Sequence, residues 1–167
     1  AGDQALTSTS PLRAHNFSTA VRELTRHVLH RLGPEDRLTQ CDWYKEHVEN
    51  QKVVITREQR IKYAIQGGIP DDVLTKELGL DYSTVSKKLR KAIDHLNKLT
   101  HINPDTFDLP SEEVDSYVEQ TVIAVAEFLD ASAHCRESVT EALEEHIDES
   151  VAVHVVEETF EKFWEYA

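Results

Sequence analysis

Apolar residues recur every three or four positions through much of this sequence, and this spacing constrains the fold more than any other feature. Residues at that spacing share one face of an α-helix. The N-terminal stripe consists of Phe17, Val21, Leu24, Val28 and Leu32. Two further stripes run through residues 114–129 and 139–163. With only five glycines, and no alternating β-branched run beyond "KVVIT", the sequence predicts an all-α bundle of six or seven helices.

Helix boundaries can be placed from capping residues. Gly33-Pro34 is expected to end the first long helix, because glycine and proline commonly follow a helix C-terminus. Thr56 is a suitable N-cap for the segment "REQRIKYAIQ", and Gly67-Gly68 would close that helix. The acidic last third is expected to form two or three helices, starting after "LP" at residues 109–110.

The distribution of charge divides the sequence into three segments, which we expect to fold together as one compact unit. Residues 1–51 hold an N-terminal helix and a linker anchored by Trp43 and Tyr44, with six basic and seven acidic residues. Residues 52–103 carry ten basic and six acidic residues, whereas residues 104–167 carry two basic and eighteen acidic residues. A basic middle beside a strongly acidic end indicates separate surfaces with separate partners.

Composition limits the classes of protein. Apolar residues make up 40% of the chain and charged residues 29%, which is typical of a globular protein rather than a disordered one. No apolar run approaches the ~20 residues that span a bilayer, and no secretory signal is recognisable. Cys41 and Cys135 form neither a disulfide framework nor a paired-cysteine zinc motif. We expect a cytoplasmic protein with no cofactor and no metal.

The segment "IPDDVLTKELGLDYSTVSKKLRKAIDHLNKL" resembles the helix-turn-helix of transcription regulators and sigma factors. Pro70 suits a first helical turn and Gly79 suits the tight turn. Leu80 and Val85 are spaced to pack the second helix on the first. The segment departs from the motif at Thr75, where a small alanine is usual, and this is expected to loosen the contact between the helices.

If this unit binds DNA or RNA, its contact residues lie on the second helix. Residues at the start of that helix would face the bases, and the basic residues after them would meet phosphate. The predicted nucleic-acid-binding residues are Tyr82, Ser83, Thr84, Ser86, Lys87, Lys88, Arg90 and Lys91. The alternative is that the motif serves only for packing or for binding a protein partner.

The second helix is expected to continue to about His101, where "LNKLTH" is similar to the Arg-Asn-x-x-x-His signature of the HEPN ribonucleases. In that signature Asn97 would match the polar residue and His101 the histidine. Leu96 stands in place of the arginine and cannot stabilise a developing phosphate charge. Arg22 or Arg26 of a partner chain could supply it. We therefore predict a structural helix end without hydrolysis of RNA, and no catalytic residue is assigned.

Two other clusters have a structural and a functional interpretation. Glu23, His27 and His30 share a helix face, but three ligands on one helix seldom close a metal site, so a polar flank is the favoured interpretation. A C-terminal apolar group forms either part of the core or an association surface. That group consists of Phe160, Phe163, Trp164 and Tyr166.

From end to end the chain resembles the predicted pPIWI-associating nucleases, prokaryotic proteins found beside defence genes. The similarity is carried by "LRAHNFSTAVRELTRHVLHRLGPED", "RIKYAIQGG", the helix-turn-helix, "LNKLTHINPDTFDLP" and "EALEEHIDESV". In that family such segments form the N-terminal helical region, and the proposed nuclease domain follows. The resemblance implies a sensor, binding or oligomerisation module of an antiphage defence protein. A HEPN-type ribonuclease and a DNA-binding transcription regulator remain the alternatives.

Overall fold

The computed structural model of the chain describes residues 12–107 and 109–165, with side chains through residue 151. In these ranges it has six helices and one two-stranded antiparallel sheet, so the predicted all-α fold is confirmed. The helices are α2 (Arg13–Leu32), α3 (Glu35–Leu38), α4 (Arg57–Gln66), the π-helix η1 (Val73–Glu77), α5 (Ser83–Leu99) and α6 (Ser111–Glu165). The strands are β1 (His47–Glu49) and β2 (Lys52–Val54).

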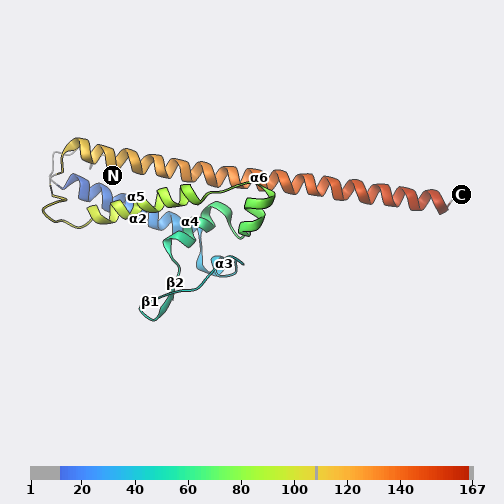
Figure 1. Ribbon diagram of the computed structural model, residues 1–167, viewed down its shortest axis with the longest axis horizontal. Helices are drawn as coiled ribbons and strands as arrows, with labels where there is room; N and C mark the ends of the chain where they lie inside the picture. The colour runs from blue at the N-terminus through green and yellow to red at the C-terminus, as the bar shows by residue number, and fades with distance from the viewer. Residues whose placement is uncertain (1–11, 108, 166–167) are drawn as a thin grey trace.

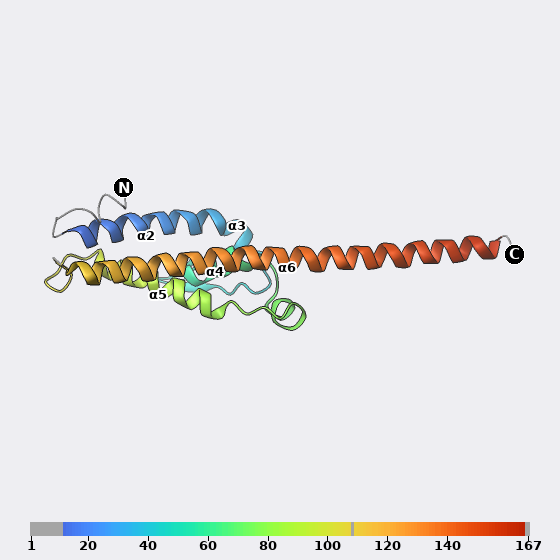
Figure 2. The same cartoon turned by 90° about the horizontal axis from the view of Figure 1, so that it is seen from above.

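The bundle is built around α4 and α5. Both α2 and the first half of α6 pack against these two helices, while the second half of α6 extends well beyond the bundle (Figures 1 and 2). The β1–β2 hairpin and α3 lie on the side of the bundle away from α6 (Figure 1). No helix among the described residues is both long and apolar enough to cross a bilayer.

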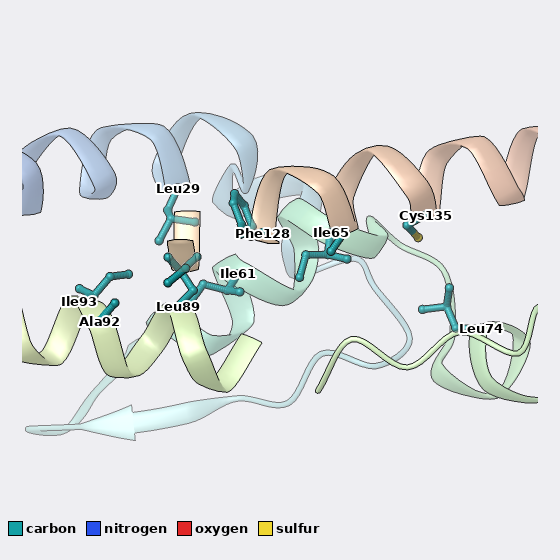
Figure 3. Packing of buried hydrophobic residues seen from close by; sticks show 11 residues of the cluster. Leu29, Ile61, Ile65, Leu74, Leu89, Ala92, Ile93, Phe128 and Cys135 are labelled. Carbon is teal, nitrogen blue, oxygen red and sulfur yellow. The ribbon is translucent and has the colours of Figure 1, made fainter. Parts of the chain in front are cut away.

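The main core joins the four long helices. Leu29 of α2, Ile61 of α4, Leu89 of α5 and Phe128 of α6 are each at most 4% exposed and belong to one cluster (Figure 3). Each such side chain contributes about 1.5–3 kcal/mol by leaving water. A second, smaller cluster at the other end of the bundle contains Ala14, Leu99, Leu109 and Val114.

The predicted helix boundaries between residues 33 and 67 are confirmed. The α2 helix ends at Leu32, and Gly33 caps it through its N–H. Thr56 and Gln59 form a capping box at the start of α4, with the Gln59 N–H donating to Thr56 Oγ1 at 3.2 Å and Thr56 N–H to Gln59 Oε1 at 2.8 Å. Gly67 follows α4 with a φ of 61°, a conformation that glycine adopts without strain.

The linker contains a hairpin that the sequence analysis did not predict. Asn50 and Gln51 join its strands with φ values of 49° and 63°, as in a type I′ turn. The linker is anchored to α4 as expected for Trp43, whose Nε1–H donates to Gly67 O at 3.1 Å. The ammonium of Lys62 lies 4.4 Å from the centre of the same ring.

The predicted apolar stripe of α2 is wrong for most of its members. Leu24, Val28 and Leu32 are 63%, 39% and 43% exposed, and only Phe17 of the stripe is buried. The buried face instead includes Ala14, Ser18 and Leu29. Small side chains at two of these positions allow a close approach of the neighbouring helices, which an apolar spacing rule does not detect.

The acidic third forms one continuous helix, so the prediction of two or three helices there is wrong. No glycine or proline occurs between Ser111 and Glu165. Without a breaker, each turn can add its backbone hydrogen bonds to the helix before it. The apolar group at residues 160, 163, 164 and 166 lies outside the described side chains.

The segment before α5 is shorter and wider than the predicted first helix. Its regular part is the π-helix Val73–Glu77, and Leu78 N–H donates to Val73 O at 3.1 Å. The Thr75 hydroxyl donates to Asp71 O at 2.8 Å, a bond back to the preceding turn that competes with the helical ladder. Gly79 then turns the chain with a φ of 66°.

Candidate functional site

The start of α5 is fixed by Asp81. Its carboxylate accepts hydrogen bonds from the Ser83 N–H at 2.8 Å and the Ser83 hydroxyl at 3.2 Å. These bonds hold the pKa of Asp81 below its ordinary value, because they favour the ionised carboxylate. Leu80 and Val85 are half-buried and pack against the main core, so they orient the first turn of α5.

Three of the eight predicted nucleic-acid-binding residues contact other parts of the bundle. The Tyr82 hydroxyl lies 3.1 Å from His134 Nδ1 on α6, and their rings meet edge to face. Lys88 forms an ion pair with Glu127 at 2.8 Å, and Arg90 forms one with Glu58 at 2.8 Å. These two ion pairs are solvent-exposed, so the cations remain reachable but their charge is largely offset.

The other five residues form a smaller surface. Ser83, Thr84, Lys87 and Lys91 are exposed and Ser86 is half-buried. Lys87 and Lys91 lie one helical turn apart, and neither makes an ion pair with a described residue. The surface of α5 with uncompensated positive charge is therefore smaller than the sequence pattern indicated.

The residues that resemble the HEPN signature do not come together as that signature requires. The α5 helix ends two residues before His101, whose side chain is exposed, while Asn97 lines a cavity between α2, α4 and α5. Leu96 is 1% exposed, so the position of the missing arginine belongs to the core. Arg22 and Arg26 of the same chain line that cavity with Asn97, whereas His101 does not.

Glu23, which shares a face of α2 with His27 and His30, forms ion pairs with two arginines. Its carboxylate lies 2.7 Å from Arg22 and 3.4 Å from Arg26. The hydrogen bond from Arg22 lowers the pKa of Glu23 below its ordinary value. Within the described residues, no group of three His, Cys, Asp or Glu side chains is placed to hold a metal ion.

A second surface runs along α6. Positions spaced alternately by four and three residues are all exposed, and we call them the α6 seam. The seam consists of Val122, Ala126, Leu129, Ala133, Arg136, Thr140, Leu143 and Ile147. Its distal part lies on the projecting half of the helix, where Leu143 and Ile147 are 57% and 58% exposed (Figure 1).

The α6 seam was not predicted as a surface. The apolar spacing puts Leu129 and Leu143 on predicted stripes, but the buried face of the helix is a neighbouring one that includes Phe128, Ala131 and Cys135. The alternating spacing of four and three residues in the seam could have indicated a second apolar face on this helix, beside the face that is buried. Which face meets the bundle depends on the partner helices, and the spacing does not contain that information.

The fold and these surfaces define a helical module with a long projecting helix. Residues 1–125 match the family of predicted pPIWI-associating nucleases, and the chain belongs to this family. It is also similar to the chromosome segregation protein sudA of Emericella nidulans, with 32% identity over 87 residues. That similarity covers 51% of the chain and only 7% of sudA. No solved structure matches the chain.

Proposed function

We propose that the chain is an assembly module of a defence-associated nuclease system, in which two copies associate through the α6 seam. The observation that carries this proposal is the exposure of Leu143 and Ile147, together with Val151 at 56%, on a helix half that extends past the bundle. A single amphipathic helix in water is marginally stable, because its stability comes mainly from packing of its apolar face. A partner would supply that packing.

The seam residues favour a second copy of the chain as the partner. Their spacing is that of a heptad, in which Leu129 and Leu143 occupy d positions and Ile147 an a position. Leucine at d and a β-branched residue at a are typical of parallel two-stranded coiled coils. The other a positions are Ala126, Ala133 and Thr140, and the two alanines would let two helices approach closely.

Charge on the projecting segment favours a parallel pair. In the part of the seam beyond the bundle, Glu144 lies on one flank and His146 lies on the other. In a parallel pair, the acidic flank of each helix faces the neutral flank of its partner. An antiparallel pair would place acidic flanks opposite each other, and like charges at that distance are destabilising.

Analytical ultracentrifugation of two matched variants tests the assembly. Leu143→Ser/Ile147→Ser removes the distal seam, and Glu141→Ser/Glu145→Ser makes the same number of changes on other faces of the same turns. We expect a dimer for the wild type and for the control, and a monomer for the seam variant. A wild-type monomer throughout the micromolar range would overturn the proposal.

A cross-link tests the orientation. In a parallel pair, residue 150 lies opposite its own copy, because it follows Leu143 by seven residues. In a Cys41→Ser background, Ser150→Cys should form an intermolecular disulfide under mild oxidation. Ser116→Cys, which is exposed near the start of α6 away from the seam, serves as the control. Equal cross-linking of both variants would contradict a seam-mediated parallel pair.

Binding of nucleic acid through α5 is the second candidate. Its support is the pair Lys87 and Lys91, which form no ion pair with a described residue and share a helix face with the exposed Thr84. Lysines on one exposed helix face suit contacts with consecutive phosphates. Electrophoretic mobility shift at several salt concentrations tests this function, since affinity due to phosphate contacts falls steeply with salt.

A further inference from the structure

A cavity of about 380 Å³ between α2, α4 and α5 concentrates positive charge in an otherwise acidic protein. Four arginines line it: Arg22 and Arg26 from α2, and Arg57 and Arg60 from α4. Glu23 is the sole carboxylate among its lining residues. The formal charge of the lining is therefore +3, in a chain whose net charge is −13.

Arg60 is the most informative of the four. Its side chain belongs to a residue only 8% exposed, and burial lowers the pKa of its guanidinium. One of its nitrogens donates to Gly33 O at the end of α2, where the helix dipole supplies about half a negative charge. No described carboxylate lies within 4.0 Å of it, and the more distant charge of Glu35 offsets only part of the effect of burial on its pKa. A buried cation with so little compensation is costly unless an anion completes its surroundings.

The other arginines are placed to share an anion with Arg60. Arg22 is held by Glu23 at 2.7 Å and by Thr100 Oγ1 at 3.2 Å, so its position is fixed. Arg57 pairs with Asp94 at 2.6 Å, and Arg26 is largely exposed at the edge. Guanidinium groups hold phosphate through paired N–H bonds and stay charged at any physiological pH.

Three polar side chains without a formal charge also line the cavity: Thr25, His30 and Asn97. Burial and the nearby charges of Arg60 and Arg26 lower the pKa of His30, which favours its neutral imidazole. Asn97 lines the same cavity from α5. The cavity has three aliphatic residues, Leu29, Ile55 and Ile93, and its lining includes no Phe, Tyr or Trp ring on which a base could stack.

We propose that this cavity binds a phosphate-bearing ligand and recognises its phosphate groups rather than its base. The cavity volume lies in the range of small-molecule sites. Because several arginines converge and the lining includes no Phe, Tyr or Trp ring, affinity should rise with the number of phosphates and change little between adenine and guanine. The site is separate from both the α6 seam and the exposed lysines of α5.

Isothermal titration calorimetry of the full chain tests the proposal by measuring the affinity for inorganic tripolyphosphate, ATP, GTP and AMP. We expect saturable binding of tripolyphosphate, ATP and GTP with dissociation constants within about threefold of one another, and weaker binding of AMP. Lack of saturable tripolyphosphate binding up to millimolar concentration would overturn the proposal. A strong preference for ATP over tripolyphosphate would also contradict phosphate-based recognition.

Variants assign the binding to the cavity. Arg26→Gln/Arg57→Gln should weaken tripolyphosphate binding by about tenfold to a hundredfold, the usual effect of losing charge-assisted hydrogen bonds. Arg31→Gln/Arg37→Gln removes two exposed cations outside the cavity and should change affinity less than about threefold. Thermal unfolding without ligand establishes that both variants are folded. Equal losses in the two variants would show nonspecific attraction and refute the site.

Two further probes distinguish the source of the phosphate. A single-stranded oligonucleotide with a 5′-phosphate is compared with the same strand bearing a 5′-hydroxyl, each competing against tripolyphosphate. Competition by the phosphorylated strand alone identifies a nucleic-acid end as a ligand of the cavity. Competition by ATP but by neither strand identifies a free nucleotide, and both outcomes support recognition of phosphate.

Discussion

Lys88 Nζ lies 2.8 and 2.9 Å from the two carboxylate oxygens of Glu127, and this ion pair joins α5 to α6. Lys88, which the sequence pattern predicted to contact phosphate, therefore already has a carboxylate partner within the fold. Both side chains are partly exposed, so water screens the attraction and the pair stabilises the fold by no more than about 1 kcal/mol. Because Lys88 is paired, a test of nucleic-acid binding should target Lys87 and Lys91 instead.

Any duplex binding by α5 should depend on Lys87 and Lys91. Lys87→Glu/Lys91→Glu is expected to abolish binding, because it replaces the two unpaired cations with like charges to phosphate. The matched control Lys45→Glu/Lys52→Glu changes exposed lysines on the linker and should retain most of the affinity. Mobility shifts measured between 50 and 200 mM salt give the comparison. Unchanged affinity in the α5 variant would eliminate this interface.

The segment "LNKLTH" should not cleave RNA. Leu96 is buried where the HEPN arginine would stand, and His101 lies beyond the end of α5. Without a cation at the developing charge, such a site loses roughly two to three orders of magnitude in rate. Purified wild type and His101→Ala are incubated with single-stranded RNA and compared on a denaturing gel. Cleavage that only the wild type performs would show that His101 is catalytic.

The capping box of α4 should be measurable in the free energy of unfolding. Thr56→Ala removes the oxygen that accepts the Gln59 N–H, and this should destabilise the fold by about 1 kcal/mol. Thr84→Ala changes an exposed threonine in the first turn of α5 and should cost less than about 0.5 kcal/mol. Urea denaturation followed by circular dichroism measures both. Equal effects would mean that the box does not stabilise α4.

Stability should fall as the pH decreases from 7 to 5, in part because of His30. Burial and the positive charges of Arg60 and Arg26 lower its pKa in the folded protein. The unfolded chain therefore binds the proton more readily, so stability present above pH ~6.5 is lost as the pH drops. His30→Gln should flatten this part of the profile, and His47→Gln, which changes an exposed histidine on β1, serves as the control. A steeper profile in His30→Gln would contradict the assignment.

The two cysteines should differ in reactivity. Burial raises the pKa of both thiols, but Cys135 is 1% exposed in the main core, whereas Cys41 is only half-buried in the linker. Ellman's reagent should therefore modify one thiol per chain in the native protein, with the second reacting at the rate of unfolding. Cys41→Ser should remove the native phase. Rapid modification of Cys135 in that variant would be inconsistent with its position in the core.

Local signals in the sequence were sufficient for most helix ends. The capping box at Thr56 and the turn at Gly67 depend on residues within a few positions of each other, so their chemistry is visible in the sequence. The hairpin was missed because Asn50 is followed by Gln51, whereas a glycine usually marks a type I′ turn. The single α6 helix would have followed from the absence of glycine and proline.

Packing between distant segments could not be predicted in the same way. The exposed face of α2, with Leu24 and Leu32, satisfies the apolar spacing as well as the buried face does. Only the position of the neighbouring helices decides between the two faces. The arginine cavity combines residues of α2 and α4 that lie up to 38 positions apart, from Arg22 to Arg60, and no motif connects them.

The uninterrupted course of α6 has a mechanical consequence. A helix rises 1.5 Å per residue, so the part beyond Thr140 is a rod of roughly 40 Å that starts inside the bundle. With no glycine or proline to bend it, a tilt of about 5° at the bundle would swing the far end by roughly 3 Å. A small rearrangement among α2, α4 and α5 is thereby amplified into a displacement large enough to bring distant groups into or out of contact.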